Sequence, residues 1–181
     1  MFQEVLGRVV RLLTSPKAEW ATIAAEPLDR RKLIMTYVAP LAAVPAAATI
    51  IGPGLFGPMT LFGAISSAIA SFVFSVVWVF VFAVIVAELA PSFGARRDAD
   101  AAFKVAAFAP SAAWAAGAFH IVPALSILAF VGALYSLYLL YLGIPALMKP
   151  AADKAGVYTL AAIGVSILAM LVLGWILSIL T

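Results

Sequence analysis

Two long stretches of the chain contain no acidic residue, lysine or arginine. One runs from Leu33 to Ala87 and the other from Val105 to Met148. A helix needs about 20 mostly apolar residues to cross a bilayer, so each stretch is long enough for two spanning helices. Turn-forming residues divide the first stretch at 52–58, and His120-Ile121-Val122-Pro123 divides the second.

The pattern therefore predicts an all-α, polytopic transmembrane bundle of five spans in residues 33–181, preceded by a cytoplasmic arm of residues 1–32. The expected spans are about 33–51, 61–87, 101–119, 123–148 and 156–180. Asp98 or Asp100 is expected to cap the third span at its N-terminus. That span is short and contains Pro110 and Lys104, so a re-entrant segment is the alternative.

The N-terminal arm has a different pattern, in which apolar residues recur at helical spacing in residues 2–13 and charged residues take the other face. Pro16 is expected to open a second short helix that carries Trp20 and ends before Pro27. Such an amphipathic helix can lie in the headgroup layer of a membrane. The alternative is that it packs over the cytoplasmic ends of the spans, and the two arrangements are compatible.

Composition agrees with a membrane protein. Charged residues make up 10% of the chain and hydrophobic residues 66%, whereas soluble domains average about 25% and 45–50%. The chain has no cysteine, which excludes disulfides and thiolate metal sites.

The distribution of lysine and arginine predicts the orientation, because cytoplasmic loops carry an excess of these residues. With five spans, all 11 lysines and arginines fall on one side. We therefore expect a multi-pass protein of the cell inner membrane, with its N-terminus in the cytoplasm and its C-terminus outside.

Small residues suggest how the helices pack. Gly63, Ser67, Ser71 and Ser75 recur at every fourth position of the second span, a spacing that lets helix backbones approach closely. We expect packing within the bundle, and a homodimer seam is the alternative. The alanine-rich third span is expected to be buried.

Two groups of residues are candidates for binding. The first could contact lipid headgroups or a partner protein through cationic and interfacial side chains, and it comprises Arg8, Arg11, Trp20, Glu88, Arg96, Arg97 and Lys104. The second, Tyr135, Tyr138 and Tyr141, could line an intramembrane groove, or form a packing face with hydroxyls bonded to Ser67, Ser71 or Ser136. His120 is interpreted as a polar residue at the membrane edge.

The sequence gives no sign of catalysis, cofactors, metal binding or nucleic-acid binding. Nucleotide-binding loops, zinc-protease motifs and serine elbows are absent. No charged residue falls within the central part of a predicted span, where a proton- or ion-coupled transporter needs one.

Two segments resemble the Yip (Ypt-interacting protein) family, and in particular its bacterial members. They are Ser15–Pro27, with the sequence SPKAEWATIAAEP, and Tyr135–Lys149, with the sequence YSLYLLYLGIPALMK. The resemblance implies a five-helix membrane protein with a cytoplasmic N-terminus. Eukaryotic relatives bind prenylated Rab-type GTPases, but their long cytoplasmic region with an Asp-Leu-Tyr-Gly-Pro motif has no counterpart here, so that activity is not carried over.

The sequence thus predicts a non-catalytic membrane organiser that interacts with lipids or proteins. Its expected partners are membrane lipids, with a second copy or another membrane protein as further candidates. A small transporter or channel for a neutral or lipophilic solute is the alternative.

Overall fold

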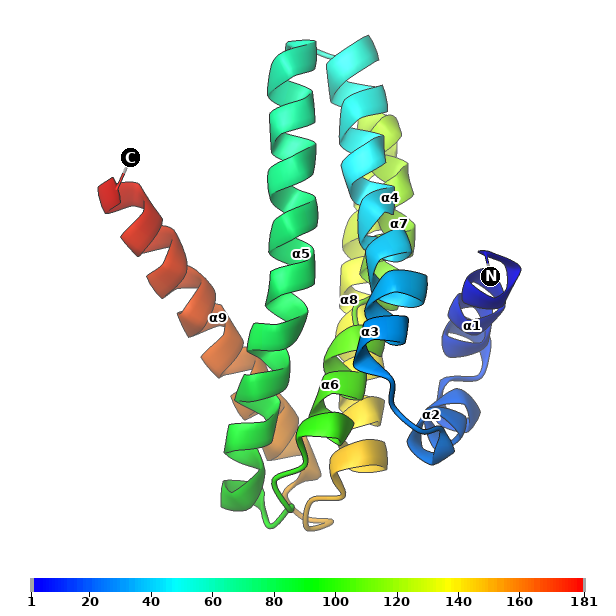
Figure 1. Ribbon diagram of the computed structural model, residues 1–181, viewed down its shortest axis with the longest axis vertical. Helices are drawn as coiled ribbons and strands as arrows, with labels where there is room; N and C mark the ends of the chain where they lie inside the picture. The colour runs from blue at the N-terminus through cyan, green and yellow to red at the C-terminus, as the bar shows by residue number, and fades with distance from the viewer. Residues whose placement is uncertain (1, 181) are drawn as a thin grey trace.

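The computed structural model describes residues 2–180, excluding the side chains of residues 2, 123, 174 and 176–180. The described chain is a bundle of helices with a two-helix arm at its side (Figure 1). In chain order the elements are α1 (Phe2–Thr14), α2 (Pro16–Ala25), α3 (Arg30–Leu33), the π-helix η1 (Ile34–Val38), α4 (Ala39–Thr49), the π-helix η2 (Ile50–Phe56), α5 (Leu61–Leu89), the 3-10 helix η3 (Ala90–Phe93), α6 (Ala99–Phe108), α7 (Ser111–Ala116), the 3-10 helices η4 (Gly117–Ile121) and η5 (Pro123–Leu125), α8 (Ser126–Met148) and α9 (Ala155–Leu180).

Four helical segments in the described chain are long and apolar enough to cross a membrane. They are Arg30–Phe56, Leu61–Phe93, Ser126–Met148 and Ala155–Leu173. They correspond to the first, second, fourth and fifth predicted spans.

The first span is longer than predicted, because Gly52-Pro53-Gly54 remains helical within η2. A Cβ atom on Gly52 would lie 2.6 Å from the carbonyl oxygen of Ile121 and 2.7 Å from that of His120. This glycine therefore permits a close approach of two backbones and does not end the helix. The chain turns only after Phe56, and the Thr60 hydroxyl caps α5 by accepting from the Gly63 N–H at 3.1 Å.

The predicted third span over 101–119 is not one of the four long apolar segments, and no single helix covers it. The segment is divided into α6, α7 and η4, with a break at Ala109-Pro110, because proline has no N–H to continue the helical hydrogen bonds. Asp98 caps α6, as one of the two expected residues, and its Oδ1 accepts from the N–H groups of Asp100 and Ala101 at 3.0 and 2.9 Å.

Segment 99–121 runs beside the first long segment from one end to the other. At one end Arg30 pairs with Asp100, Nη2 to Oδ1 at 2.6 Å. At the other end Gly52 lies against the backbone of His120 and Ile121. Residues 102–109 are all buried, which confirms that this alanine-rich stretch lies inside the bundle.

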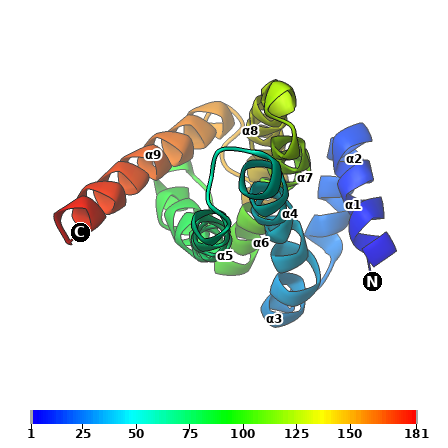
Figure 2. The ribbon, with the colours of Figure 1, turned by 90° about the horizontal axis from the view of Figure 1, so that it is seen from above.

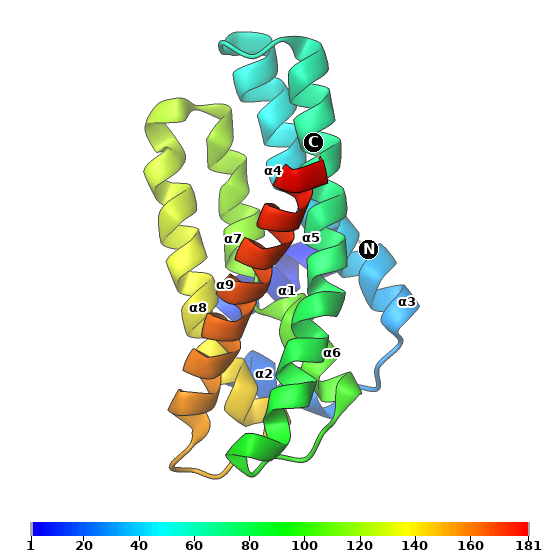
Figure 3. The same cartoon turned by 90° about the vertical axis from the view of Figure 1, so that its left-hand side faces the viewer.

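The two ends of the chain lie on opposite sides of the bundle (Figure 2). Helix α9 packs near its start, where Phe93 and Tyr158 stack at 5.0 Å and the Tyr158 hydroxyl donates to the Val86 carbonyl. It then leans away from the other helices (Figure 1), and seen from that side it crosses in front of the bundle (Figure 3). Ser67 and Ser71 are exposed, so the small-residue stripe does not pack inside the chain there. The homodimer seam stays a prediction.

Candidate lipid- and partner-binding site at the N-terminal arm

Helix α1 is apolar on more than one side. Val5, Val9 and Leu12 face the bundle and belong to its core. Leu6, Val10 and Leu13 are 45%, 54% and 38% exposed and form a second apolar stripe, which we call the outer stripe. The arm therefore packs on the bundle and still presents an apolar surface.

Helix α2 is anchored by Trp20, whose side chain is 1% exposed. The indole lies against Gly143 of α8, where an added Cβ would come within 2.6 Å of Cζ2. It also meets the Phe108 ring edge-on at 6.4 Å. The indole N–H has no acceptor among the described residues. Trp20 is thus a buried anchor, and its indole would have to move away from Gly143 before it could contact a lipid or a partner protein.

Two arginines tie α1 to α2. Arg8 donates two hydrogen bonds to the Glu26 carboxylate, at 2.9 and 2.6 Å, and Arg11 Nε donates to Glu19 at 2.7 Å. The hydrogen bonds from Arg8 hold the pKa of the Glu26 carboxyl below its usual value, against a smaller opposing effect of burial. Arg8 also lies over the Phe108 ring, 5.3 Å from its centroid. The two arginines therefore fix α1 against α2, and Arg8 also fixes α1 against the bundle.

Lys104 does not join Arg96 and Arg97 in a basic cluster, as the sequence suggested. Its side chain is buried, and Nζ donates to the carbonyl oxygens of Ile23, at 2.9 Å, and Glu26. These carbonyls belong to the C-terminal end of α2, where a cation is favoured by the helix dipole. The two arginines of the loop lie apart from Lys104. Arg97 donates to Glu88, and Arg96 is exposed.

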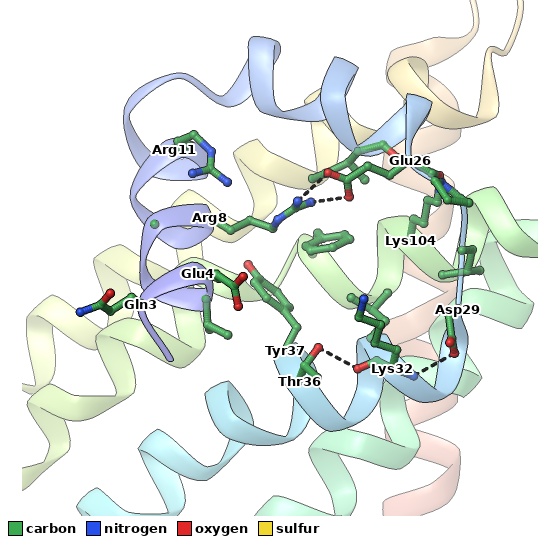
Figure 4. Close-up of a pocket in the computed structure, with 17 residues that line it drawn as sticks. Gln3, Glu4, Arg8, Arg11, Glu26, Asp29, Lys32, Thr36, Tyr37 and Lys104 are labelled. Carbon is green, nitrogen blue, oxygen red and sulfur yellow. Dashed lines mark hydrogen bonds and ion pairs between the residues drawn. The ribbon is translucent and has the colours of Figure 1, made fainter. Parts of the chain in front are cut away.

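A groove of about 770 Å³ lies between α1 and the start of the first long segment (Figure 4). Its apolar wall includes Val5, Leu33 and Phe108. The Tyr37 hydroxyl lies 2.8 Å from the hydroxyl of Ser111, which donates to the Phe108 carbonyl at 2.6 Å. We call this cavity the arm groove.

The arm groove contains charges of both signs. Its cations are Arg8, Arg11, Lys32 and Lys104, and its acids are Glu4, Glu26 and Asp29. The Lys32 ammonium points into it (Figure 4). Lys32 and Asp29 are not among the binding candidates predicted from the sequence, where their signal is the Asp-Arg-Arg-Lys run before the first span.

The predicted tyrosine groove of α8 remains untested. Tyr135 donates to the Leu13 carbonyl at 2.7 Å and not to the expected serines, of which Ser136 accepts from the Ala113 N–H at 2.9 Å. Tyr138 and Tyr141 are 44% and 53% exposed. His120 is exposed near the end of the first span. The described residues contain no group of three or more metal-ligating acidic or histidine side chains.

The structure joins the two segments that carry the family resemblance, because Trp20 of the first sits on Gly143 of the second. A family model for the Yip1 domain matches residues 10–176. No curated protein and no solved structure matches the chain. The match extends from α1 into α9 and covers most of the sequence, so the chain belongs to the Yip1-domain family of multi-span membrane proteins.

Proposed function

We propose that the chain is a non-catalytic organiser of the cytoplasmic membrane leaflet, which gathers phospholipid around its N-terminal arm. The observation that carries the proposal is the docked geometry of α1. One apolar stripe is buried in the bundle, and the outer stripe of Leu6, Val10 and Leu13 stays exposed on a helix whose other face carries Arg8 and Arg11. An amphipathic surface of this kind partitions into the headgroup layer of a membrane.

The proposal includes a topology of five crossings of the inner membrane, with a cytoplasmic N-terminus and an external C-terminus. The broken segment 99–121 supports a crossing, because its two ends contact opposite ends of the first long segment. Five crossings place every lysine and arginine on the cytoplasmic side.

Co-extraction of lipid tests the function. The full chain is taken from its membrane in polymer-bounded discs, and the phospholipid classes in the discs are compared with those of the whole membrane. We expect enrichment of anionic lipid, and we expect Leu6→Ser with Val10→Ser to reduce it. The matched control is Ala18→Ser with Ala21→Ser, two exposed positions of α2 outside the outer stripe.

An unchanged lipid profile in the Leu6/Val10 variant would contradict the proposal. Solute flux in proteoliposomes that is lost on changing Tyr138 or Tyr141 would replace it with a transporter function.

A further inference from the structure

We propose that the arm groove binds the headgroup of one zwitterionic phospholipid, whose phosphate meets Lys32 and whose primary ammonium meets Asp29. The inference rests on the proposed position of the arm at the membrane surface. It adds one specific site for a zwitterionic lipid, distinct from the anionic lipid that the arm is expected to gather around it.

Most charges in the groove already have partners within the chain. Arg8 is held by Glu26, Arg11 by Glu19, and Lys104 by two backbone carbonyls. The Lys32 ammonium, in contrast, makes no hydrogen bond or ion pair within the described part of the chain, although its charge is felt by Glu4. It is therefore available to a ligand.

Asp29 is available in the same way. One carboxylate oxygen, Oδ1, caps α3 by accepting from the backbone N–H of Lys32 at 2.9 Å. The carboxylate makes no ion pair with the Lys32 ammonium or with any other described cation. The carboxylate of Asp29 and the ammonium of Lys32 thus line the same groove without forming an ion pair with each other.

The mixed charge selects the ligand class. A simple anion at Lys32 would enter a groove that Asp29 also lines, and a simple cation at Asp29 would enter one that Lys32 also lines. A molecule that carries a phosphate and an ammonium a few bonds apart satisfies both signs. Phosphatidylethanolamine has this headgroup, and its ammonium retains the N–H donors that a quaternary choline lacks.

Size and surroundings favour a lipid over a soluble metabolite. The volume of about 770 Å³ lies within the range of about 300–1,000 Å³ that is typical of small-molecule sites. The groove lies at the start of the first long apolar segment, where Leu33, Thr36 and Tyr37 line it. Leu33 and the Phe108 ring offer apolar contact to the glycerol and upper acyl carbons.

Native mass spectrometry tests the site. The full chain is reconstituted in nanodiscs with equal amounts of phosphatidylethanolamine, phosphatidylcholine and phosphatidylglycerol, released into detergent and weighed. We expect one retained phosphatidylethanolamine. Lys32→Gln should weaken its retention about fivefold, the effect of one exposed charge-assisted contact. Arg31→Gln is the matched control, because it removes a neighbouring cation that does not line the groove.

Asp29→Asn is a second, independent variant for this test, because asparagine preserves the helix cap while removing the charge. It should abolish the preference for phosphatidylethanolamine over phosphatidylcholine. Equal retention by Lys32→Gln and Arg31→Gln would overturn the site, and preferred retention of phosphatidylglycerol would overturn the lipid class. Displacement of the lipid by soluble glycerophosphoethanolamine would show that a free headgroup is the ligand and would overturn the lipid assignment.

The two proposals fail differently. If the arm does not gather lipid, the Leu6/Val10 variant leaves the disc lipids unchanged, whatever Lys32→Gln does. If only the groove site is wrong, the disc lipids respond to the outer stripe while the mass spectra of Lys32→Gln and Arg31→Gln agree.

Discussion

Replacing Gly143 with alanine should loosen the N-terminal arm, because this glycine is the seat of Trp20. The new Cβ would lie 2.6, 2.8 and 2.9 Å from three atoms of the indole, which is 1% exposed and has little room to shift. Overpacking of a tight interior costs about 1–3 kcal/mol. The helical preference of alanine over glycine acts on α8 whether or not the arm is docked, so it cancels and arm docking should weaken by about 1–3 kcal/mol.

Hydrogen exchange measured by mass spectrometry can resolve this local effect, since arm and bundle open with different free energies. The expected loss corresponds to exchange about 5- to 160-fold faster in residues 2–25, with α5 unchanged. Gly164→Ala is the matched control, because it makes the same helical substitution in α9 where a Cβ meets nothing within 4 Å. Equal exchange of the arm in the two variants would refute the seating of Trp20 on Gly143.

Three further predictions concern the contacts around the arm. Lys104→Met removes the donor to two carbonyls of α2, so it should weaken arm docking by about 2 kcal/mol and speed exchange of residues 16–26; unchanged exchange would contradict this role. Because Arg8 lowers the pKa of the Glu26 carboxyl, the pair stabilises the arm fully above the usual pKa of glutamate and loses this effect as pH falls through the lowered value. The side chain is 42% exposed, so the effect should stay below about 1 kcal/mol, and Glu26→Gln should flatten the pH dependence of exchange in residues 2–25; a variant with the same acid profile as the native chain would refute the linkage. Asp98→Ala should cost α6 about 1 kcal/mol, seen as faster exchange of amides 99–108, whereas Asp98→Asn should keep most of the cap.

The positions of four spans could be predicted because hydropathy is a strong and local signal. The second span begins at Leu61 as predicted, and the fifth differs from its expected start by one residue. The break in the third span has a local cause in Pro110, but the contacts that stabilise the chain beside the break are distant in sequence and could not be predicted. The Ser111 hydroxyl donates to the Phe108 carbonyl and lies 2.8 Å from the hydroxyl of Tyr37, which is 74 residues from Ser111.

The candidate site was predicted only in part. Helical spacing in residues 2–13 correctly indicated an amphipathic helix, but it could not show which apolar residues face the bundle. Lys104 was grouped with Arg96 and Arg97 because they are neighbours in sequence, whereas its ammonium reaches Ile23, 81 residues away. The seat of Trp20 on Gly143 and the opening of Lys32 on the arm groove are likewise tertiary features, which residue patterns do not contain.

The most direct test of the account is the depth of α1 in a membrane. The chain has no cysteine, so a single Val10→Cys can carry an environment-sensitive fluorophore on the outer stripe. Asp153→Cys, in the exposed loop before α9, is the aqueous control. In vesicles that contain brominated acyl chains, we expect strong quenching at residue 10 and almost none at residue 153. Equal, weak quenching at both positions would contradict the claim that the docked arm contacts lipid.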